Sequence, residues 1–434
     1  MIKVINTKDG SDKIQKEVDA LLNRSQLEFG EVNRTVEDII TNVRDNKDKA
    51  LLEYTEKFDG VKLDRIQVTE EEIEEAYNSC DKELIDALEE AAENIREFHQ
   101  KQLINSWVDN SKKGIMLGQM YNPIEKVGIY VPGGTAPLPS TVLMNAVPAK
   151  VAGVEEIIMV TPPSKDGGVS ANILAAAKIA GVDKIYKAGG AQGIAALAFG
   201  TETIPKVYKI VGPGNIYVAI AKRIVYGFVD IDMIAGPSEI LVLADETANP
   251  RYVAADMLSQ AEHDTLASAI LVTTSEKLAE EVEKELKIQT AELSRKEIAE
   301  ESLKNFGAII IAKDMEEALY YTNEIAPEHL EVMVESPFEM ISSIKNAGAI
   351  FLGQYSTEPL GDYFAGTNHT LPTSSTAKFY SPLGVDDFVK KSSLIYYSRE
   401  NLQKQKDKII AIAESEGLQA HANSVRVRFE DDSK

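Results

Sequence analysis

The feature that most constrains the fold is a series of short, almost uninterrupted apolar runs between Val127 and Asp245, separated by Gly/Pro loops and alanine-rich segments. Strands that are buried on both faces read as continuous apolar runs, because neither face meets water. Residues 172–180 and 194–198 fit crossover helices between such strands. We therefore predict an open α/β sheet, with strands in the runs VGIYV, EIIMV, KIYKAGG and VYKIVGPG.

A second series with the same alternation follows directly. It consists of the run EILVLAD, a helix around residues 252–262, the run ASAILVTTS, a long charged helix and the run GAIIIAK. Strand, helix and strand in this order predict a second α/β unit. With 434 residues, the chain also exceeds what one core usually organises, so two or more domains are expected.

The two ends of the chain differ from this central part. Residues 1 to about 120 are charged and poor in glycine and proline, and residues 81–102 carry apolar side chains close to the helical period. The tail from about residue 384 is also charged and is interpreted as helical. Both ends are therefore expected to be mostly helical, and the tail is expected to be an arm rather than a domain.

The charge balance excludes some classes of partner. The chain has 69 acidic and 46 basic residues, a net charge of −23. Nucleic acids and anionic membranes are bound through basic surfaces, so neither is an expected partner.

No apolar run approaches the roughly 20 residues that span a bilayer, and the first residues lack the pattern of a signal peptide. A single cysteine, Cys80, excludes an intrachain disulfide, and a reducing cytoplasm is the expected location.

Two glycine-rich loops are candidates for ligand binding. In VPGGTAPLPS, residues 131–140, the glycines either let the backbone approach a ligand or only form a tight turn. The segment VGPGNIYVA, residues 211–219, partly matches a dinucleotide-binding fingerprint, with an acidic residue, Asp232, about twenty residues further on. However, Tyr217 replaces the third glycine and Pro213 stiffens the turn. The spacing alone therefore supports nucleotide binding only weakly.

Histidines are scarce in this chain, with five in all, so each position is informative. Gln260 and His263 are three residues apart on a predicted helix, where they either hold one metal ion or leave His263 to interact with the helix C-terminus. His329 follows Glu328 in a turn opened by Pro327. This pair either transfers protons, since imidazole titrates near neutrality, or lies in the first turn of a helix.

The remaining histidines lie in different settings. His369 and Asp362 belong to the long polar segment LGDYFAGTNHTLPT, for which a binding role is favoured. His421 lies near the end of the chain, five residues after Glu416. His99 is on the amphipathic helix and is interpreted as structural.

Taken together, these residues lie in segments that resemble one known family. The stretch from Ile231 to His263, IDMIAGPSEILVLADETANPRYVAADMLSQAEH, resembles the signature of the histidinol dehydrogenases. Supporting segments in the expected order are GIYVPGG, GGAQGIAALA, VGPGNIYVA, APEHLEV, GDYFAGTNHTLPT and EGLQAHANS. The resemblance implies oxidation of L-histidinol through L-histidinaldehyde to L-histidine with two NAD, the last steps of histidine biosynthesis.

The resemblance also implies roles for individual residues. Glu328 and His329 are the implied catalytic pair. One zinc ion per subunit would be held by Gln260, His263, Asp362 and His421. NAD contacts would come from Tyr130, Gln192 and Asn215, which makes the 212–214 glycines part of a cofactor loop and removes Asp232 as a ribose ligand. Substrate contacts would come from Ser238, Gln260, His263, His329, Asp362, Glu416 and His421, with His369 lining the same pocket.

The fold implied is two incomplete Rossmann-like domains with open parallel sheets, flanked by helical N-terminal and C-terminal arms. Residues 1–25 form the first arm, residues 26–128 and 242–383 a domain with the metal and catalytic residues, residues 129–241 a domain with the NAD loops, and residues 384–434 an arm exchanged in a homodimer that shares its active sites.

Two alternative functions would use the same residues. One is a zinc hydrolase, in which Glu328 activates a metal-bound water, and the other is a non-catalytic binding protein on a dehydrogenase scaffold.

Overall fold

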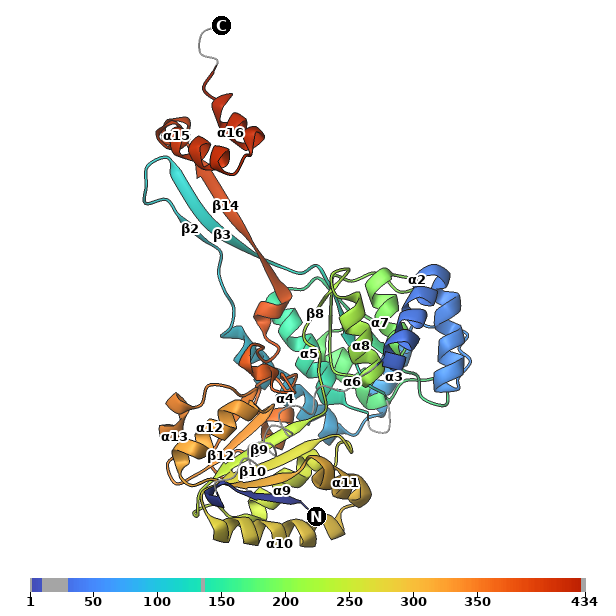
Figure 1. Cartoon of the computed structure of the whole chain (residues 1–434). Helices are drawn as coiled ribbons and strands as arrows, with labels where there is room; N and C mark the ends of the chain where they lie inside the picture. Colours follow the sequence, from blue (N-terminus) through green and yellow to red (C-terminus); the bar gives the residue numbers. More distant parts are fainter. Residues whose placement is uncertain (1, 10–29, 134–136, 431–434) are drawn as a thin grey trace. The chain divides into compact units, whose positions relative to one another are not determined.

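A computed structural model of the chain describes residues 2–9, 30–133 and 137–430. The chain divides into two compact units (Figure 1). The first contains Met1–Gln102 and Ile124–Phe388, and the second contains Leu103–Pro123 and Val389–Lys434.

A five-stranded parallel sheet in the first unit has the order β6-β5-β4-β7-β8. Its core contains Ile158, Val160 and Ile210 together with Ala195 and Leu197 of a covering helix, so the apolar runs that predict these strands are buried as expected. The strands are β4 (Lys126–Tyr130), β5 (Glu156–Thr161), β6 (Lys184–Lys187), β7 (Lys209–Val211) and β8 (Asp230–Ile231). The helices between them are α5 (Pro139–Ala152), α6 (Ala171–Ala180), α7 (Gly190–Phe199) and α8 (Ile216–Val225).

Three helices that precede these strands in the sequence pack against the same sheet domain. They are α2 (Gly30–Asp59), α3 (Glu70–Ser79) and α4 (Lys82–Gln100). Helix α2 contacts α7 and α8, α3 contacts α6, and α4 contacts α5 and α6. The prediction that residues 26–128 belong with residues 242–383 is therefore wrong for these helices, because α2 buries its apolar face in the core of the five-stranded sheet and α3 and α4 contact the helices that cover this sheet.

A six-stranded parallel sheet, also in the first unit, has the order β1-β11-β10-β9-β12-β13. Successive residues of β9 face opposite cores: Ile240 and Val242 pack on one side, and Leu241 and Leu243 on the other. The strands are β1 (Lys3–Asn6), β9 (Glu239–Ala244), β10 (Ser268–Thr273), β11 (Ala308–Ile311), β12 (His329–Met333) and β13 (Ala349–Leu352). The associated helices are α9 (Pro250–Ala261), α10 (Glu276–Glu292), α11 (Lys296–Phe306), α12 (Met315–Ile325), α13 (Pro337–Met340) and α14 (Glu358–Tyr363).

The beginning of the chain is an edge strand of this sheet. Strand β1 pairs with β11 in parallel, and Ile5 is buried in the core. The predicted helical arm over residues 1–25 is therefore wrong for residues 3–6, because an apolar edge can be buried against β11. The rest of that prediction, residues 10–25, lies outside the described residues.

The second unit joins two distant segments of the sequence in one antiparallel sheet. Strand β3 (Ile115–Pro123) pairs with β2 (Trp107–Asp109) and, over its whole length, with β14 (Val389–Tyr397). Two packed helices follow, α15 (Arg399–Ser415) and α16 (Gln419–Arg426). The tail is helical as predicted from residue 399 onwards, but its first part is a strand that the sequence analysis missed.

Within the described ranges, no helix combines the length and apolar character needed to cross a membrane.

Candidate active site

The catalytic pair predicted from sequence lies at the start of a central strand. His329 is the first residue of β12, where it pairs with Ile240 of β9 and Ala349 of β13. The predicted loop or helical turn is thus corrected: Glu328 ends the turn and His329 begins a strand. The pair lies at the amino end of the parallel strands, next to Glu239 at the start of β9.

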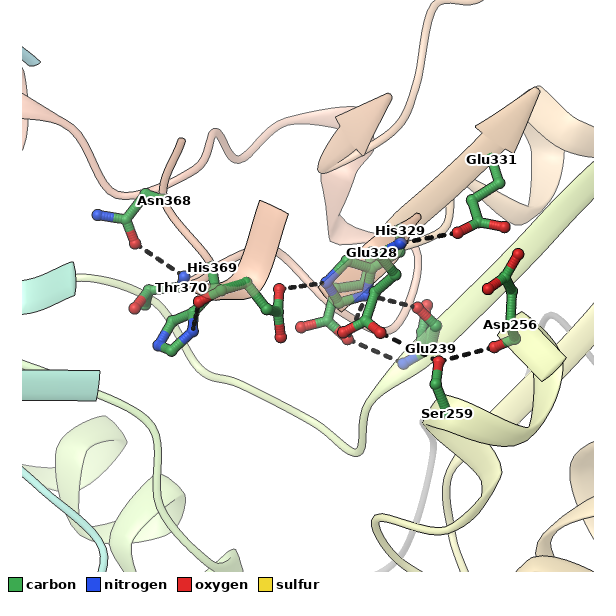
Figure 2. A network of polar contacts seen from close by, with 11 residues as sticks. Glu239, Asp256, Ser259, Glu328, His329, Glu331, Asn368, His369 and Thr370 are labelled. Carbon is green, nitrogen blue, oxygen red and sulfur yellow. Dashed lines mark hydrogen bonds and ion pairs between the residues drawn. The ribbon is translucent and has the colours of Figure 1, made fainter. Parts of the chain in front are cut away.

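Hydrogen bonds on both ring nitrogens orient the imidazole of His329 (Figure 2). Its Nδ1 lies 3.0 Å from the carbonyl oxygen of Glu239, and its Nε2 lies 3.3 Å from Oδ1 of Asp362. A carbonyl oxygen can only accept a hydrogen bond, so Nδ1 must carry a proton. The ionised carboxylate of Asp362 also only accepts, so Nε2 donates to it, and Nε2 is the nitrogen whose proton can be exchanged.

Glu328 is buried beside this imidazole. Its Oε2 accepts a hydrogen bond of 2.8 Å from the backbone N–H of Glu239 and lies 3.7 Å from Nδ1 of His329. Burial raises the pKa of Glu328 to about 8. Burial alone would lower the pKa of His329, but the negative charges of Glu328 and Asp362 outweigh it and raise that pKa to about 10. The site thus contains two adjacent groups that exchange protons near or above neutral pH.

Asp362 approaches from the short helix α14 rather than from the loop predicted around it. Burial would raise its pKa, but the hydrogen bond and positive charge of His329 lower the pKa of Asp362 to about 2. Glu358 lies one turn earlier on α14 and accepts a hydrogen bond of 3.0 Å from Ser259. Ligand atoms of His329, Glu358 and Asp362 all lie within 4.8 Å of one another, a spacing at which one metal ion could be held.

Gln260 and His263 come from the end of α9. Gln260 is in the last turn of the helix and is 0 % exposed, and neither its Oε1 nor its Nε2 has a hydrogen-bond partner. His263 is not in the helix as predicted, but in the turn that follows, where its N–H donates to the carbonyl of Gln260. Desolvation lowers the pKa of His263, against the attraction of the neighbouring Asp362 and Glu262 carboxylates.

Two further predicted residues lie next to this group. His369 has its Nδ1 3.1 Å from the carbonyl oxygen of Asp362, which fixes the Nδ1–H tautomer of this ring as well. Ser238 directly precedes Glu239, and its carbonyl accepts a hydrogen bond from the N–H of Ser268. The structure thus gathers Glu328, His329 and Asp362 by direct contacts, with His369 bonded to the Asp362 backbone.

A metal ion fits the donors of the first unit. Buried polar groups are normally hydrogen-bonded, so the two unpaired amide atoms of Gln260 point to a missing partner. An amide oxygen, an imidazole and a carboxylate are suitable ligands for zinc or a similar divalent metal. The residues present therefore agree with the metal that the resemblance implies.

Glu416 and His421 lie in the second unit. Glu416 is the residue that ends α15, His421 lies on α16, and both are exposed there. The other predicted metal and substrate residues all belong to the first unit.

Four acidic residues around the predicted catalytic pair were not predicted from the sequence: Glu239, Asp256, Glu331 and Glu358. Glu239 supplies both its N–H and its carbonyl to the pair, while its carboxylate accepts from the N–H of Ser374 at 2.7 Å. Glu331 is 0 % exposed and accepts a hydrogen bond from the N–H of Glu358. Burial is the main cause of the raised pKa of Glu331, and the charge and hydrogen bond of Asp256 raise this pKa further. Glu331 could have been predicted from the alternation of side chains along a strand, because residues 329 and 331 of β12 point to the same face.

The three predicted NAD residues lie at the carboxyl ends of strands in the five-stranded sheet. Tyr130 ends β4, and its hydroxyl accepts a hydrogen bond of 3.1 Å from the N–H of Gly190 at the start of α7. Gln192 lies buried in the first turn of that helix, and Asn215 caps α8 by accepting from the N–H groups of Tyr217 and Val218. Loops at this edge of a parallel sheet commonly bind ligands.

Comparison with known proteins agrees with this arrangement. The family model described as histidinol dehydrogenase matches residues 22–429. The chain belongs to the histidinol dehydrogenase family. Two similar relatives, both named histidinol dehydrogenase, come from Clostridium acetobutylicum (61 % identity over 429 residues, 99 % of both chains) and Caldanaerobacter subterraneus (61 % over 424 residues, 96 % of this chain and 98 % of the relative).

A solved structure extends the match to the fold. The crystal structure of histidinol dehydrogenase from Elizabethkingia anophelis superposes with a TM-score of 0.93 and 41 % identity, covering 99 % of this chain and 98 % of the other. The α/β fold class that the resemblance implied, with two open parallel sheets, is confirmed.

Proposed function

We propose that this protein is an NAD- and zinc-dependent oxidoreductase that converts L-histidinol through L-histidinaldehyde to L-histidine and reduces two NAD in the last steps of histidine biosynthesis. The observation that carries the proposal is the buried Glu328–His329 pair, with Nδ1 of His329 held by the carbonyl of Glu239 and Nε2 directed at the carboxylate of Asp362. A four-electron oxidation needs a base for each hydride transfer and an activated water between them, and this pair can provide both.

His329 is the proposed base for both oxidations in its neutral form, which a metal ion bound at Asp362 would favour by neutralising one of the carboxylate charges that raise the pKa of His329. Its Nδ1–H is held by the carbonyl of Glu239, so Nε2 takes the hydroxyl proton of the alcohol as hydride leaves the same carbon. In the second oxidation Nε2 takes a proton from the hydrated aldehyde. Because the ring is held at both nitrogens, it needs no reorientation between the two steps.

Glu328 activates the water between the oxidations. It takes a proton from water as the water oxygen forms a bond to the aldehyde carbon, while Nε2 of His329 returns the proton it took in the first oxidation to the carbonyl oxygen, which gives the hydrate and restores the neutral ring. Its raised pKa, caused by burial, makes its carboxylate a stronger base than an exposed glutamate. The backbone N–H of Glu239 donates a hydrogen bond to the Glu328 carboxylate and so fixes its orientation.

Zinc would be held by Gln260, His263 and Asp362 of one subunit and His421 of its partner. When bound, the metal orients the amine and imidazole of histidinol. The unpaired amide of Gln260 supports this assignment. Ser238, Glu416 and His369 complete the proposed substrate pocket.

NAD would bind at Tyr130, Gln192 and Asn215, and it accepts the hydride in each oxidation. Tyr130 and Gln192 are tied to the start of α7, and Asn215 to the start of α8. The proposed assembly is a homodimer in which the C-terminal residues of each subunit complete the site of the other. A cytoplasmic location is proposed because the only cysteine, Cys80, cannot form an intrachain disulfide.

The stoichiometry of the reaction tests the proposal. We expect two NADH per L-histidinol consumed to completion, loss of the reaction after chelation and recovery with zinc. One NADH per histidinol would contradict the role given to Glu328. No NADH from folded, zinc-loaded protein would favour the zinc hydrolase or the binding protein instead.

A further inference from the structure

A buried ion pair outside the catalytic centre has no assigned role. The ammonium of Lys222, on α8, contacts Oδ1 of Asp232, directly after β8. Their side chains are only 2 % and 1 % exposed. A buried pair of this kind is weak support for stability, because desolvating both charges offsets most of their attraction. Its hydrogen-bond partners are therefore a better guide to its role.

Both members of the pair bind the backbone of one residue, Gly212. The N–H of Gly212 donates to Oδ2 of Asp232 at 2.8 Å, and Nζ of Lys222 donates to the carbonyl of Gly212 at 2.9 Å. Oδ1 of Asp232 also accepts from the N–H of Met233 at 2.7 Å. The carboxylate is thus occupied by three donors within the protein, which agrees with removing Asp232 as a ribose ligand.

Gly212 has a backbone conformation and a close contact that only glycine tolerates. Its φ is +110°, and a Cβ at this position would lie 2.2 Å from the carbonyl oxygen of Tyr130. The loop backbone therefore lies directly against the end of β4. Three residues later, Asn215 is fixed by its own hydrogen bonds to the start of α8. The segment 212–215 is consequently restrained at both ends.

We infer that Lys222 and Asp232 are positioning residues for the dinucleotide site: together they hold the backbone of Gly212, and with it Asn215, in the form that receives NAD. The inference rests on the proposed function, since it assigns NAD to this loop. The pair acts on the cofactor only through the loop backbone. Losing it should weaken NAD binding without changing the proton chemistry at His329.

Two variants of the full-length protein test this role. Lys222→Met removes the donor to Gly212, and the double variant Lys222→Met with Asp232→Leu replaces the pair by apolar groups without leaving a buried charge unpaired. The matched control is Lys209→Met. Lys209 is also buried and paired, with Asp230 and Asp387, but these contacts hold no part of the 212–215 loop.

Three measurements separate positioning from general stability. We expect NAD to bind at least about tenfold more weakly to both test variants, by calorimetry or by the KM for NAD. The KM for histidinol and kcat at saturating NAD should change by less than about twofold. Amide exchange in the NAD-free protein should be faster at Gly212 and Gly214. The control should show none of these changes.

Unchanged NAD affinity and unchanged amide exchange in a folded double variant would overturn the inference. If the double variant folds poorly, Asp232→Asn provides the test, because its amide oxygen can still accept a hydrogen bond from Gly212. Its NAD affinity should lie between those of the wild type and Lys222→Met. An affinity no better than that of Lys222→Met would count against the role. If the wild type itself does not bind NAD, the proposed function fails. Amide exchange then still decides whether the pair holds the loop.

Discussion

At the scale of single residues, the environment of His329 decides what its side chain can do. The carbonyl of Glu239 fixes a proton on Nδ1, and Asp362 faces Nε2. Sequence could name the Glu328–His329 pair and the neighbouring candidates. It could not say which ring nitrogen is reactive, because the decisive partner is a backbone carbonyl 90 residues away in the sequence. Every residue has a backbone carbonyl, so residue identities do not show which carbonyl will accept the hydrogen bond.

The separate role of Glu328 can be tested at this scale. Glu328→Gln keeps the size of the side chain and an oxygen that can accept from Glu239, but it removes the base for water. We expect oxidation of histidinaldehyde to slow by about 10²-fold or more, while oxidation of histidinol to the aldehyde slows much less. Rapid-mixing measurements with each substrate separately distinguish the two steps.

A matched control for this variant is Glu335→Gln, an exposed carboxylate just beyond β12. It should leave both steps unchanged. Equal slowing of both oxidations by Glu328→Gln would show that Glu328 acts through the orientation of His329 and not on water.

At the scale of elements, the strands of the two parallel sheets were predictable and those of the second unit were not. Strands β4, β5, β9 and β10 are buried on both faces, so their sequences are continuously apolar. Strand β14, VKKSSLIYY, is mostly exposed and shows neither a continuous run nor a clean alternation. Its register with β3 is fixed by pairing between segments more than 260 residues apart, which no local pattern reports.

The turn that precedes β13 is hydrogen-bonded to the backbone of the proposed catalytic pair and offers a test at this scale. The N–H groups of Gly348 and Ala349 donate to the carbonyls of Pro327 and Glu328, and a Cβ on Gly348 would lie 2.5 Å from the carbonyl oxygen of Glu328. Gly348→Ala must therefore displace Glu328. We expect kcat to fall by about 10- to 100-fold, since small misplacements of catalytic groups are costly.

The control for Gly348→Ala is Gly353→Ala at the other end of β13. Gly353 has a φ of +86°, but no atom lies within 4 Å of an added Cβ. This variant should lose about 1 kcal/mol of unfolding free energy from backbone strain and keep its kcat. If Gly348→Ala keeps full activity at unchanged stability, the turn does not position the pair.

At the scale of the whole molecule, the sequence predicted two sheet domains but assigned the N-terminal helices to the wrong one. Helices α2, α3 and α4 are amphipathic, but an apolar face does not specify which sheet it packs on, and only the tertiary contacts show it. The same limit applies to the C-terminal residues. Glu416 and His421 were assigned through the resemblance, and in the described structure they are exposed residues of the second unit.

The proposed exchange of the C-terminal arm between subunits leads to a test on mixed dimers. Asp362→Asn removes a proposed ligand from the first unit, and His421→Asn removes one from the second. Each variant alone should lose most of its activity, because every site lacks one ligand. If His421 serves the partner subunit, a heterodimer of the two variants has one site with both substitutions and one intact site. A purified heterodimer should then recover about half of the wild-type activity per dimer.

Two differently tagged variants, expressed together and purified through both tags, provide this heterodimer. If instead His421 served the site of its own chain, both sites of the heterodimer would lack a ligand, and activity would stay as low as in either parent. The metal content gives an independent reading: about one zinc per heterodimer is expected with exchange, because one of its two sites keeps all four ligands. A heterodimer without activity and without bound zinc would therefore reject the shared site, even if the oxidation of histidinol by the wild type were established.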